Sequence, residues 1–197
     1  MSLYFEIKFN NDKKLITDKD KQPLSWYFIN GLLKSRIATD NGSNEDGFDE
    51  DVNVYIAGVL NKIFTQHINI LKDIEVYNQL TKTDKRKDYT LCKNHADSLL
   101  MRCGVFPNFD SVPSEPNLKD NINRCSSWYY RAACLGSQLT VNKGLLDIFD
   151  KLYQNTETYV EVLNHVRVEV LNITQKISDS YISRLMRIAK LEHDLRD

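Results

Sequence analysis

Apolar side chains recur at intervals of three and four residues over most of this chain. The clearest run begins after an acidic stretch and comprises Val52, Tyr55, Ile56, Val59, Leu60, Ile63 and Phe64. Side chains at this spacing share one face only when the backbone is helical, because the α-helix repeats every 3.6 residues. Similar runs extend over residues 91–103, 122–139 and 159–195. The sequence therefore predicts an all-α multi-helix bundle.

The composition agrees with a single helical domain. The 197-residue chain is 42% hydrophobic and 27% charged, and it has only 7 Gly and 4 Pro, few for a fold with many tight turns. A chain of this length can bury a core without disulfides or a structural metal. We expect one domain over residues 1–197 with about six to eight helices.

Two segments depart from the helical pattern. Near the N-terminus, apolar and polar residues alternate, which predicts a short β-hairpin within residues 1–22. Residues 39–51 are polar, contain two glycines and are rich in Asp and Glu, which predicts an exposed acidic loop. The carboxylates of Asp49, Glu50 and Asp51 stand where the next helix should begin, a position that favours anions.

Several residues predict where helices end or meet. Asp84 is expected to cap a helix that runs to about Cys103, and Gly104 is expected to stop it. Residues 156–195 form either one helix or two, and the segment 178–180, Ser-Asp-Ser, favours a break there. Close approach of a neighbouring helix is expected at the small residues Ala132, Ala133, Gly136 and Ser137.

The charge and the cysteine content limit the cellular environment and the partners that we expect. The cysteines Cys92, Cys103, Cys125 and Cys134 lie in predicted helices, so we expect reduced, mostly buried thiols. No segment reaches the roughly 18 to 20 apolar residues of a membrane span, and we expect a cytoplasmic protein without membrane contact. A formal net charge of −1 offers no general attraction for nucleic acid. The local cluster Lys82, Lys85, Arg86 and Lys87 indicates a solvated helical face.

The usual catalytic and metal-binding motifs do not occur. The chain has no phosphate-binding Gly-rich loop, no Glu-x-x-His pair and no Cys-x-x-Cys pair. Cys92 and His95 are three residues apart and could share a metal ion, but Cys103 lies about 16 Å further along the same helix. We therefore expect no metal site and no cofactor, and the Cys92 and His95 pair is only a weak alternative.

One group of residues is suited to binding a ligand. Three aromatic residues and an arginine fall within one helical turn at 128–131, so at least one ring must leave the core face. Polar groups on the preceding helix could complete a pocket between helices. The candidate ligand-binding residues are Tyr89, His95, Asp97, Trp128, Tyr130 and Arg131.

These observations favour a non-enzymatic interaction or regulatory protein. The alternative is a small-molecule-binding or catalytic bundle with its pocket near His95 and Trp128. The long apolar stripe of the C-terminal segment also makes a homodimer plausible, because a terminal helix often has more apolar surface than its own domain covers.

The segment 89–107 carries Ala-Asp, paired Leu residues and Gly-Val-Phe-Pro, and the aromatic run that contains Tyr129 and Tyr130 follows it. This pattern resembles an uncharacterised bacterial all-helical family with the elements Ala-Asp, Leu-Leu, Gly-x-Phe-Pro and Tyr-Tyr. The resemblance covers about 75 residues, from Tyr89 to Leu163. It implies a helical fold, and it adds no chemistry because the family has no assigned activity.

Overall fold

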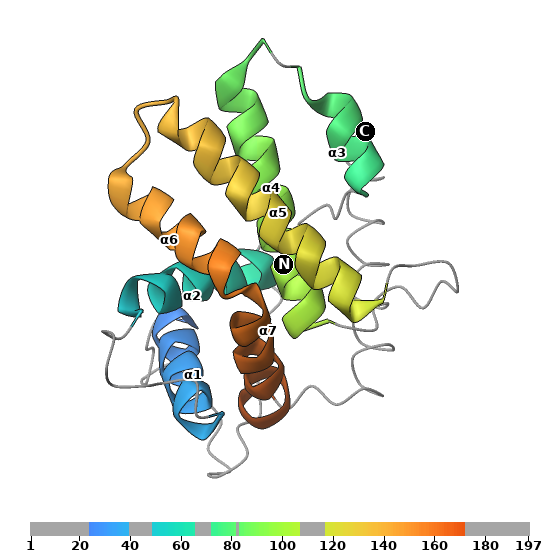
Figure 1. Ribbon diagram of the computed structural model, residues 1–197. Coiled ribbons are helices and arrows are strands. Elements are labelled where there is room, and N and C mark those ends of the chain that lie inside the picture. Colours follow the sequence, from blue (N-terminus) through green and yellow to red (C-terminus); the bar gives the residue numbers. More distant parts are fainter. Residues whose placement is uncertain (1–23, 40–48, 66–71, 82, 107–116, 172–197) are drawn as a thin grey trace, which may run out of the picture.

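The computed structural model describes residues 24–39, 49–65, 72–81, 83–106 and 117–171 (Figure 1). These residues form seven α-helices and one π-helical turn: α1 (Leu24–Ala38), α2 (Glu50–Thr65), α3 (Asp73–Gln79), α4 (Lys85–Gly104), α5 (Leu118–Ser137), α6 (Lys143–Gln154), α7 (Thr156–His165) and η2 (Val166–Val170). The described ranges contain no strand, which confirms the all-α bundle. The predicted hairpin and residues 40–48 of the acidic loop lie outside them. Within these ranges, no helix is both long and apolar enough to cross a membrane.

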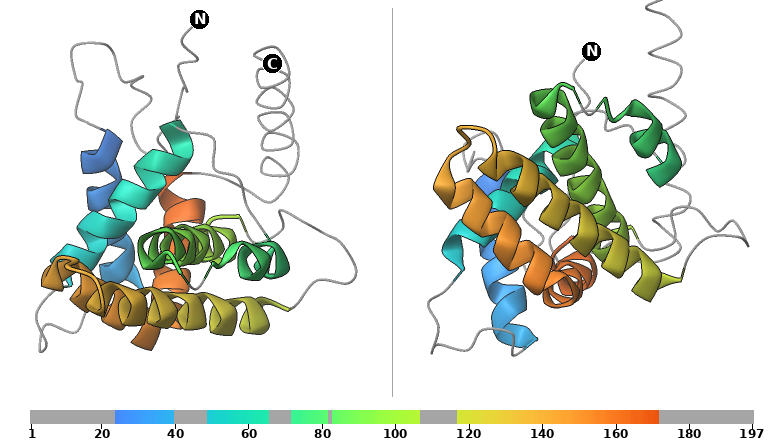
Figure 2. Two further views of the ribbon diagram at one scale, coloured as in Figure 1. Left: turned by 90° about the horizontal axis from the view of Figure 1, so that it is seen from above. Right: turned by 45° about the horizontal axis from the view of Figure 1, so that its top comes forward.

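An antiparallel pair, α4 and α5, forms the centre of the bundle (Figure 1). Helix α6 runs back along α5, and α7 packs against α4, α5 and α6. Helices α1 and α2 pair with each other, and α1 also contacts α7. The short helix α3 lies at the edge of the bundle beside α4, as the turned views show (Figure 2).

The buried faces follow the predicted periodicity. In α2, Val52, Ile56, Val59 and Leu60 are buried, and Tyr55 and Ile63 are partly buried against the same core. Burial of a large apolar side chain contributes about 1.5–3 kcal/mol, so the interior rather than helix propensity holds these segments together. The largest fully buried side chains are Tyr129, Tyr159, Phe28, Phe149, Leu32, Ile56, Leu60, Leu99, Leu100, Met101, Leu152 and Leu163.

Helix α4 begins and ends where predicted, but the geometry of its end differs from the prediction. The Asp84 carboxylate accepts a 3.0 Å hydrogen bond from the backbone N–H of Lys87, which confirms the cap. Gly104 is the last helical residue, and the following Val105 keeps right-handed backbone angles, so Gly104 is not a left-handed stop. A Cβ at Gly104 would lie 2.4 Å from Cβ of Leu163. Glycine is needed there because α4 and α7 approach closely.

Gly136 has the role that its small-residue run predicted. A Cβ at this position would lie 2.6 Å from Cδ2 of Leu146 in α6 and 3.1 Å from Cε2 of Tyr89 in α4. Its neighbours Ala132 and Ala133 are buried. The small residues of α5 therefore let both α4 and α6 approach it closely at Gly136.

The regular C-terminal helix ends earlier than the predicted break. Helix α7 passes at His165 into η2, where the Leu171 N–H donates to the Val166 carbonyl at 2.8 Å. The Tyr27 hydroxyl of α1 donates to the Val170 carbonyl at 2.7 Å, which ties this turn to the first helix. The predicted break at residues 178–180 lies outside the described residues.

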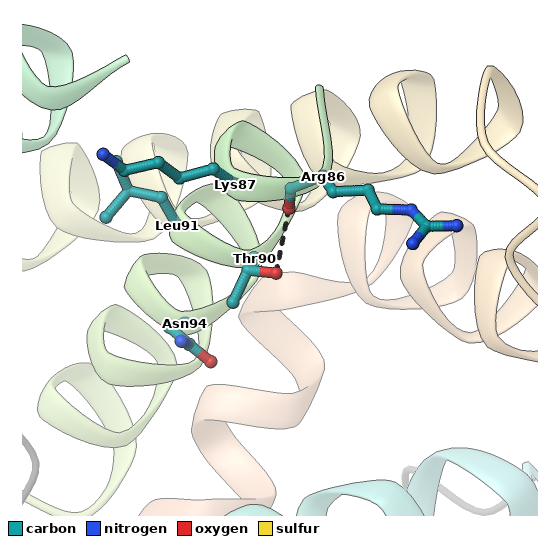
Figure 3. Close-up of a pocket in the computed structure, with 5 residues that line it drawn as sticks. All are labelled: Arg86, Lys87, Thr90, Leu91 and Asn94. Carbon is teal, nitrogen blue, oxygen red and sulfur yellow. Dashed lines mark hydrogen bonds between the residues drawn. The ribbon is translucent and has the colours of Figure 1, made fainter. Parts of the chain in front are cut away.

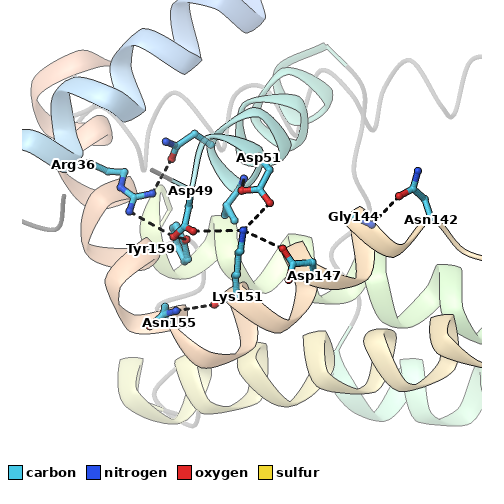
Figure 4. A network of polar contacts seen from close by, with 11 residues as sticks. Arg36, Asp49, Asp51, Asn142, Gly144, Asp147, Lys151, Asn155 and Tyr159 are labelled. Carbon is cyan, nitrogen blue, oxygen red and sulfur yellow. Dashed lines mark hydrogen bonds and ion pairs between the residues drawn. The ribbon is translucent and has the colours of Figure 1, made fainter. Parts of the chain in front are cut away.

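A polar network joins α1, α2, α6 and α7 at one end of the bundle (Figure 4). The Lys151 ammonium pairs with Asp51 at 2.9 Å, and this hydrogen bond raises the pKa of Lys151 above its usual range. The Tyr159 hydroxyl donates to Asp49 at 2.7 Å, and Arg36 lies 3.7 Å from the same carboxylate. The acidic residues that precede and begin α2 thus also bind other helices.

Candidate functional site

The six predicted ligand-binding residues do not gather in one place. They divide between different sides of α4 and α5 into three groups: Tyr89 with Asp97, His95 with Trp128 and Arg131, and Tyr130 alone. Each group makes its own contacts with other helices, so each is considered separately.

Asp97 is a buried carboxylate that binds donors from three helices. Its side chain accepts hydrogen bonds from the Tyr55 hydroxyl of α2 at 2.7 Å and from the Tyr129 hydroxyl of α5 at 2.9 Å. Lys93 of α4 donates to the second oxygen at 2.8 Å. Burial, and then the charge of Asp97, raises the pKa of both tyrosines well above its usual value, so they remain donors. Asp97, only 7% exposed, is thus fully engaged in linking α2, α4 and α5.

Aromatic rings, including those of the two tyrosine donors, pack together beside Asp97. The rings of Tyr55, Tyr89 and Tyr129 surround Phe149 of α6, with centroids 5.7, 6.2 and 5.9 Å from its centroid. Phe149 is fully buried. The Asp97 group is therefore part of the packed core.

The second group attaches α3 to the bundle through Asp73. One oxygen of its carboxylate lies 2.5 Å from Nε2 of buried His95, and the other accepts from Nε of Arg124 at 2.6 Å. Burial tends to raise the pKa of Asp73, but the hydrogen bonds from His95 and Arg124 outweigh it and hold the pKa well below its usual value. Asp73 is therefore ionised at neutral pH, and its hydrogen bonds link α3 to both α4 and α5.

An aromatic stack lies beside these Asp73 hydrogen bonds. The Tyr77 ring of α3 packs at 4.8 Å on Trp128, and His95 meets the same indole edge-on at 4.9 Å. The Arg131 guanidinium lies 5.6 Å from the centroids of both Tyr77 and Trp128. Trp128 is buried, whereas Tyr77 is 51% and Ile74 63% exposed. We call Ile74, Tyr77 and Arg131 the α3 surface.

Sequence reasoning missed Asp73 and Tyr77, although one signal was available. The two residues are four apart, so a single helical turn brings the carboxylate and the ring to the same side. The same spacing joins Lys93 to Asp97. The sequence does not mark these pairs as important, because the other residues that they contact lie on different helices.

Tyr130 lies apart from the other candidates. Its ring packs at 5.1 Å on Tyr153 of α6, and both rings are exposed. This pair forms a separate aromatic patch on the α5 and α6 side of the molecule.

The structure gives no support to the weak metal alternative at Cys92 and His95. Burial raises the pKa of the Cys92 thiol to about 11, and Asp73 already engages Nε2 of His95. Within the described ranges, no group of three His, Cys, Asp or Glu side chains could hold a metal ion.

A shallow hollow of about 350 Å³ lies on the outer side of α4 (Figure 3). It contains none of the six predicted residues and is lined by Arg86, Lys87, Thr90, Leu91 and Asn94. The side chains of Lys87 and Leu91 extend the same way, and that of Arg86 extends in the opposite direction. Lys85, Arg86 and Lys87 are all exposed, as predicted for a solvated face, and Lys82 lies outside the described residues.

Comparison of the chain with protein-family models, with curated proteins and with solved structures finds no match.

Proposed function

We propose that this protein is a non-enzymatic, cytoplasmic interaction or regulatory protein that binds a protein partner through the α3 surface. The supporting observation is the arrangement of Tyr77 and Arg131 over buried Trp128, with the exposed Ile74 on the same short helix as Tyr77. Tyrosine, tryptophan and arginine are the residues that most often dominate the binding energy of protein interfaces.

The rigidity of this surface favours binding. Tyr77 and Arg131 are held against Trp128, so a partner would order few additional side chains when it docks. The aromatic stack keeps the guanidinium in place while its N–H groups can still donate to an acceptor on the partner.

Two of the polar groups that favoured the catalytic alternative have other partners. His95 is engaged by Asp73, and Asp97 by two tyrosines and a lysine. A general base or nucleophile needs a position that a substrate can reach. Both residues are buried, which favours the interaction reading over the alternative pocket near His95 and Trp128.

Affinity purification of the full chain from its own cells, followed by quantitative mass spectrometry, tests the proposal. Ile74→Ser is the first variant, because it removes an exposed apolar side chain without touching the Trp128 stack. Tyr77→Ala is the second. Loss of one interface anchor typically costs at least about 2 kcal/mol, so recovery of a true partner should fall about thirtyfold with Tyr77→Ala.

Val54→Ser is the matched control, because Val54 is an exposed apolar residue of α2, 55% accessible. It should leave the recovered partners unchanged. Equal recovery of every protein with wild type, Ile74→Ser and Tyr77→Ala would contradict the proposal.

A further inference from the structure

We infer that the hollow on α4 is a second binding site, and that it takes an acidic peptide segment carrying an apolar anchor residue. The hollow shares no residue with the α3 surface. The inference therefore goes beyond the proposed function, and either one can fail alone.

The lining of the hollow has the chemistry that such a segment requires. Leu91 is a partly exposed apolar side chain and offers a contact for one anchor residue. Arg86 and Lys87 flank it with positive charge, and the Asn94 amide can donate to or accept from a peptide backbone. The combination of an apolar contact with cations on both sides matches an acidic, amphipathic segment.

The cations at this site are not neutralised by the fold. Within the described part of the chain, neither Arg86 nor Lys87 forms an ion pair. The two nearest acidic residues in the sequence each accept a hydrogen bond from a backbone N–H. Asp84 accepts from the Lys87 N–H, and buried Asp88 accepts from the Thr81 N–H at 2.9 Å.

The position of these charges is unfavourable for the helix itself. Cations in the first turn oppose the helix dipole and destabilise the helix. Lys85, Arg86 and Lys87 occupy the first three positions of α4. A bound acidic segment would add to the negative charge that the Asp84 cap and the first-turn Asp88 already place at this end of α4.

A peptide fits the observations better than a nucleic acid. The net charge of −1 gives the whole molecule no general attraction for any anion, so the choice between a peptide and a phosphate backbone depends on the lining of the hollow. The hollow also has no aromatic side chain on which a base could stack, and its one apolar residue is Leu91.

Fluorescence anisotropy with the full chain tests the inference. The probe is a labelled glutamate peptide of about three helical turns, with leucine at intervals of three and four. The comparison probes are the same peptide with glutamine in place of glutamate, and a single-stranded RNA of matching length. We expect the acidic peptide to bind about tenfold or more tightly than the glutamine peptide, and its affinity to fall as salt rises.

Lys87→Glu should lower the affinity at least tenfold, and Leu91→Ser should lower it for any peptide that retains leucine. Lys143→Glu is the matched control, because Lys143 is an exposed lysine at the start of α6 and its reversal changes the net charge equally. A glutamate in the first turn is favourable for a helix, so loss of binding in Lys87→Glu cannot be ascribed to unfolding.

Four outcomes would overturn the inference: no saturable binding of the acidic peptide up to about 1 mM, equal affinity for the glutamine peptide, tighter binding of the RNA, or equal effects of Lys87→Glu and Lys143→Glu. Tyr77→Ala should leave peptide binding unchanged. That result separates the hollow from the α3 surface, whatever the outcome of the partner experiment.

Discussion

Replacement of Asp97 by asparagine should destabilise the protein strongly, because the carboxylate accepts hydrogen bonds from Tyr55, Tyr129 and Lys93 within the core. A hydrogen bond to a charged group contributes about 1.5–3 kcal/mol, against about 0.5–1.5 kcal/mol for a neutral one. The change therefore costs about 1 kcal/mol at each of the two tyrosines. Loss of the partly exposed Lys93 pair adds about 1 kcal/mol more.

The expected total is a loss of about 3 kcal/mol in the free energy of unfolding, a large part of the 5–15 kcal/mol typical of a domain. Urea unfolding followed by circular dichroism at the helical band measures it, and the melting temperature should fall by about 6–12 °C. Asp150→Asn is the control, because Asp150 is exposed on α6, and it should change stability by less than about 0.5 kcal/mol.

A double-mutant cycle isolates the contact itself. Tyr129→Phe alone removes one hydroxyl donor, and the pair Asp97→Asn with Tyr129→Phe should cost less than the sum of the two single changes. If Asp97→Asn behaves like the Asp150→Asn control, or if the two changes simply add, the carboxylate does not hold the core as described.

Three further predictions concern other parts of the fold. In a Trp26→Phe background, the fluorescence of Trp128 should report the attachment of α3. Because the folded pKa of Asp73 is lowered, attachment should be complete above about pH 4 and be lost as the pH falls further. Asp73→Asn should lose the attachment at neutral pH, and an unchanged spectrum in that variant would refute the role of Asp73. Gly104→Ala should destabilise the protein by about 1–3 kcal/mol. Gly58→Ala, whose added Cβ meets nothing within 4 Å, should stabilise it by up to about 1 kcal/mol. Urea midpoints that do not move in opposite directions would count against the close approach at Gly104. The apolar stripe at the C-terminal end predicts a homodimer, and sedimentation at micromolar concentration should show twice the 22.9 kDa chain mass, so a species of 22.9 kDa alone would exclude it.

The helices were predictable where apolar periodicity was long enough to define a face. Residues 50–65 and 118–137 each repeat the stripe over several turns, and the structure has α2 and α5 there. Helix α3 has 7 residues, only two turns, and just Val76 of its side chains is buried. So short a segment carries little periodic signal, and tertiary contacts decide its place.

The candidate site was harder to predict because periodicity gives the face of a helix but not the helix that opposes it. His95 and Asp97 are two residues apart, which places them about 200° apart around α4. They could not have lined one pocket unless it wrapped around the helix, and the structure gives them different partners, α3 for His95 and α2 with α5 for Asp97. The partners themselves, Tyr55 and Asp73, are distant in the sequence and had no motif to mark them.

The carboxylate of Asp97 has a consequence for how the chain folds. Its hydroxyl donors come from residues 42 and 32 positions away, on two different helices. An intermediate in which α4 pairs with only one of those helices would leave an ionised group partly desolvated and short of donors, which is unfavourable. Partly assembled forms are thereby disfavoured, so we expect these three helices to gain and lose their structure in a single concerted transition.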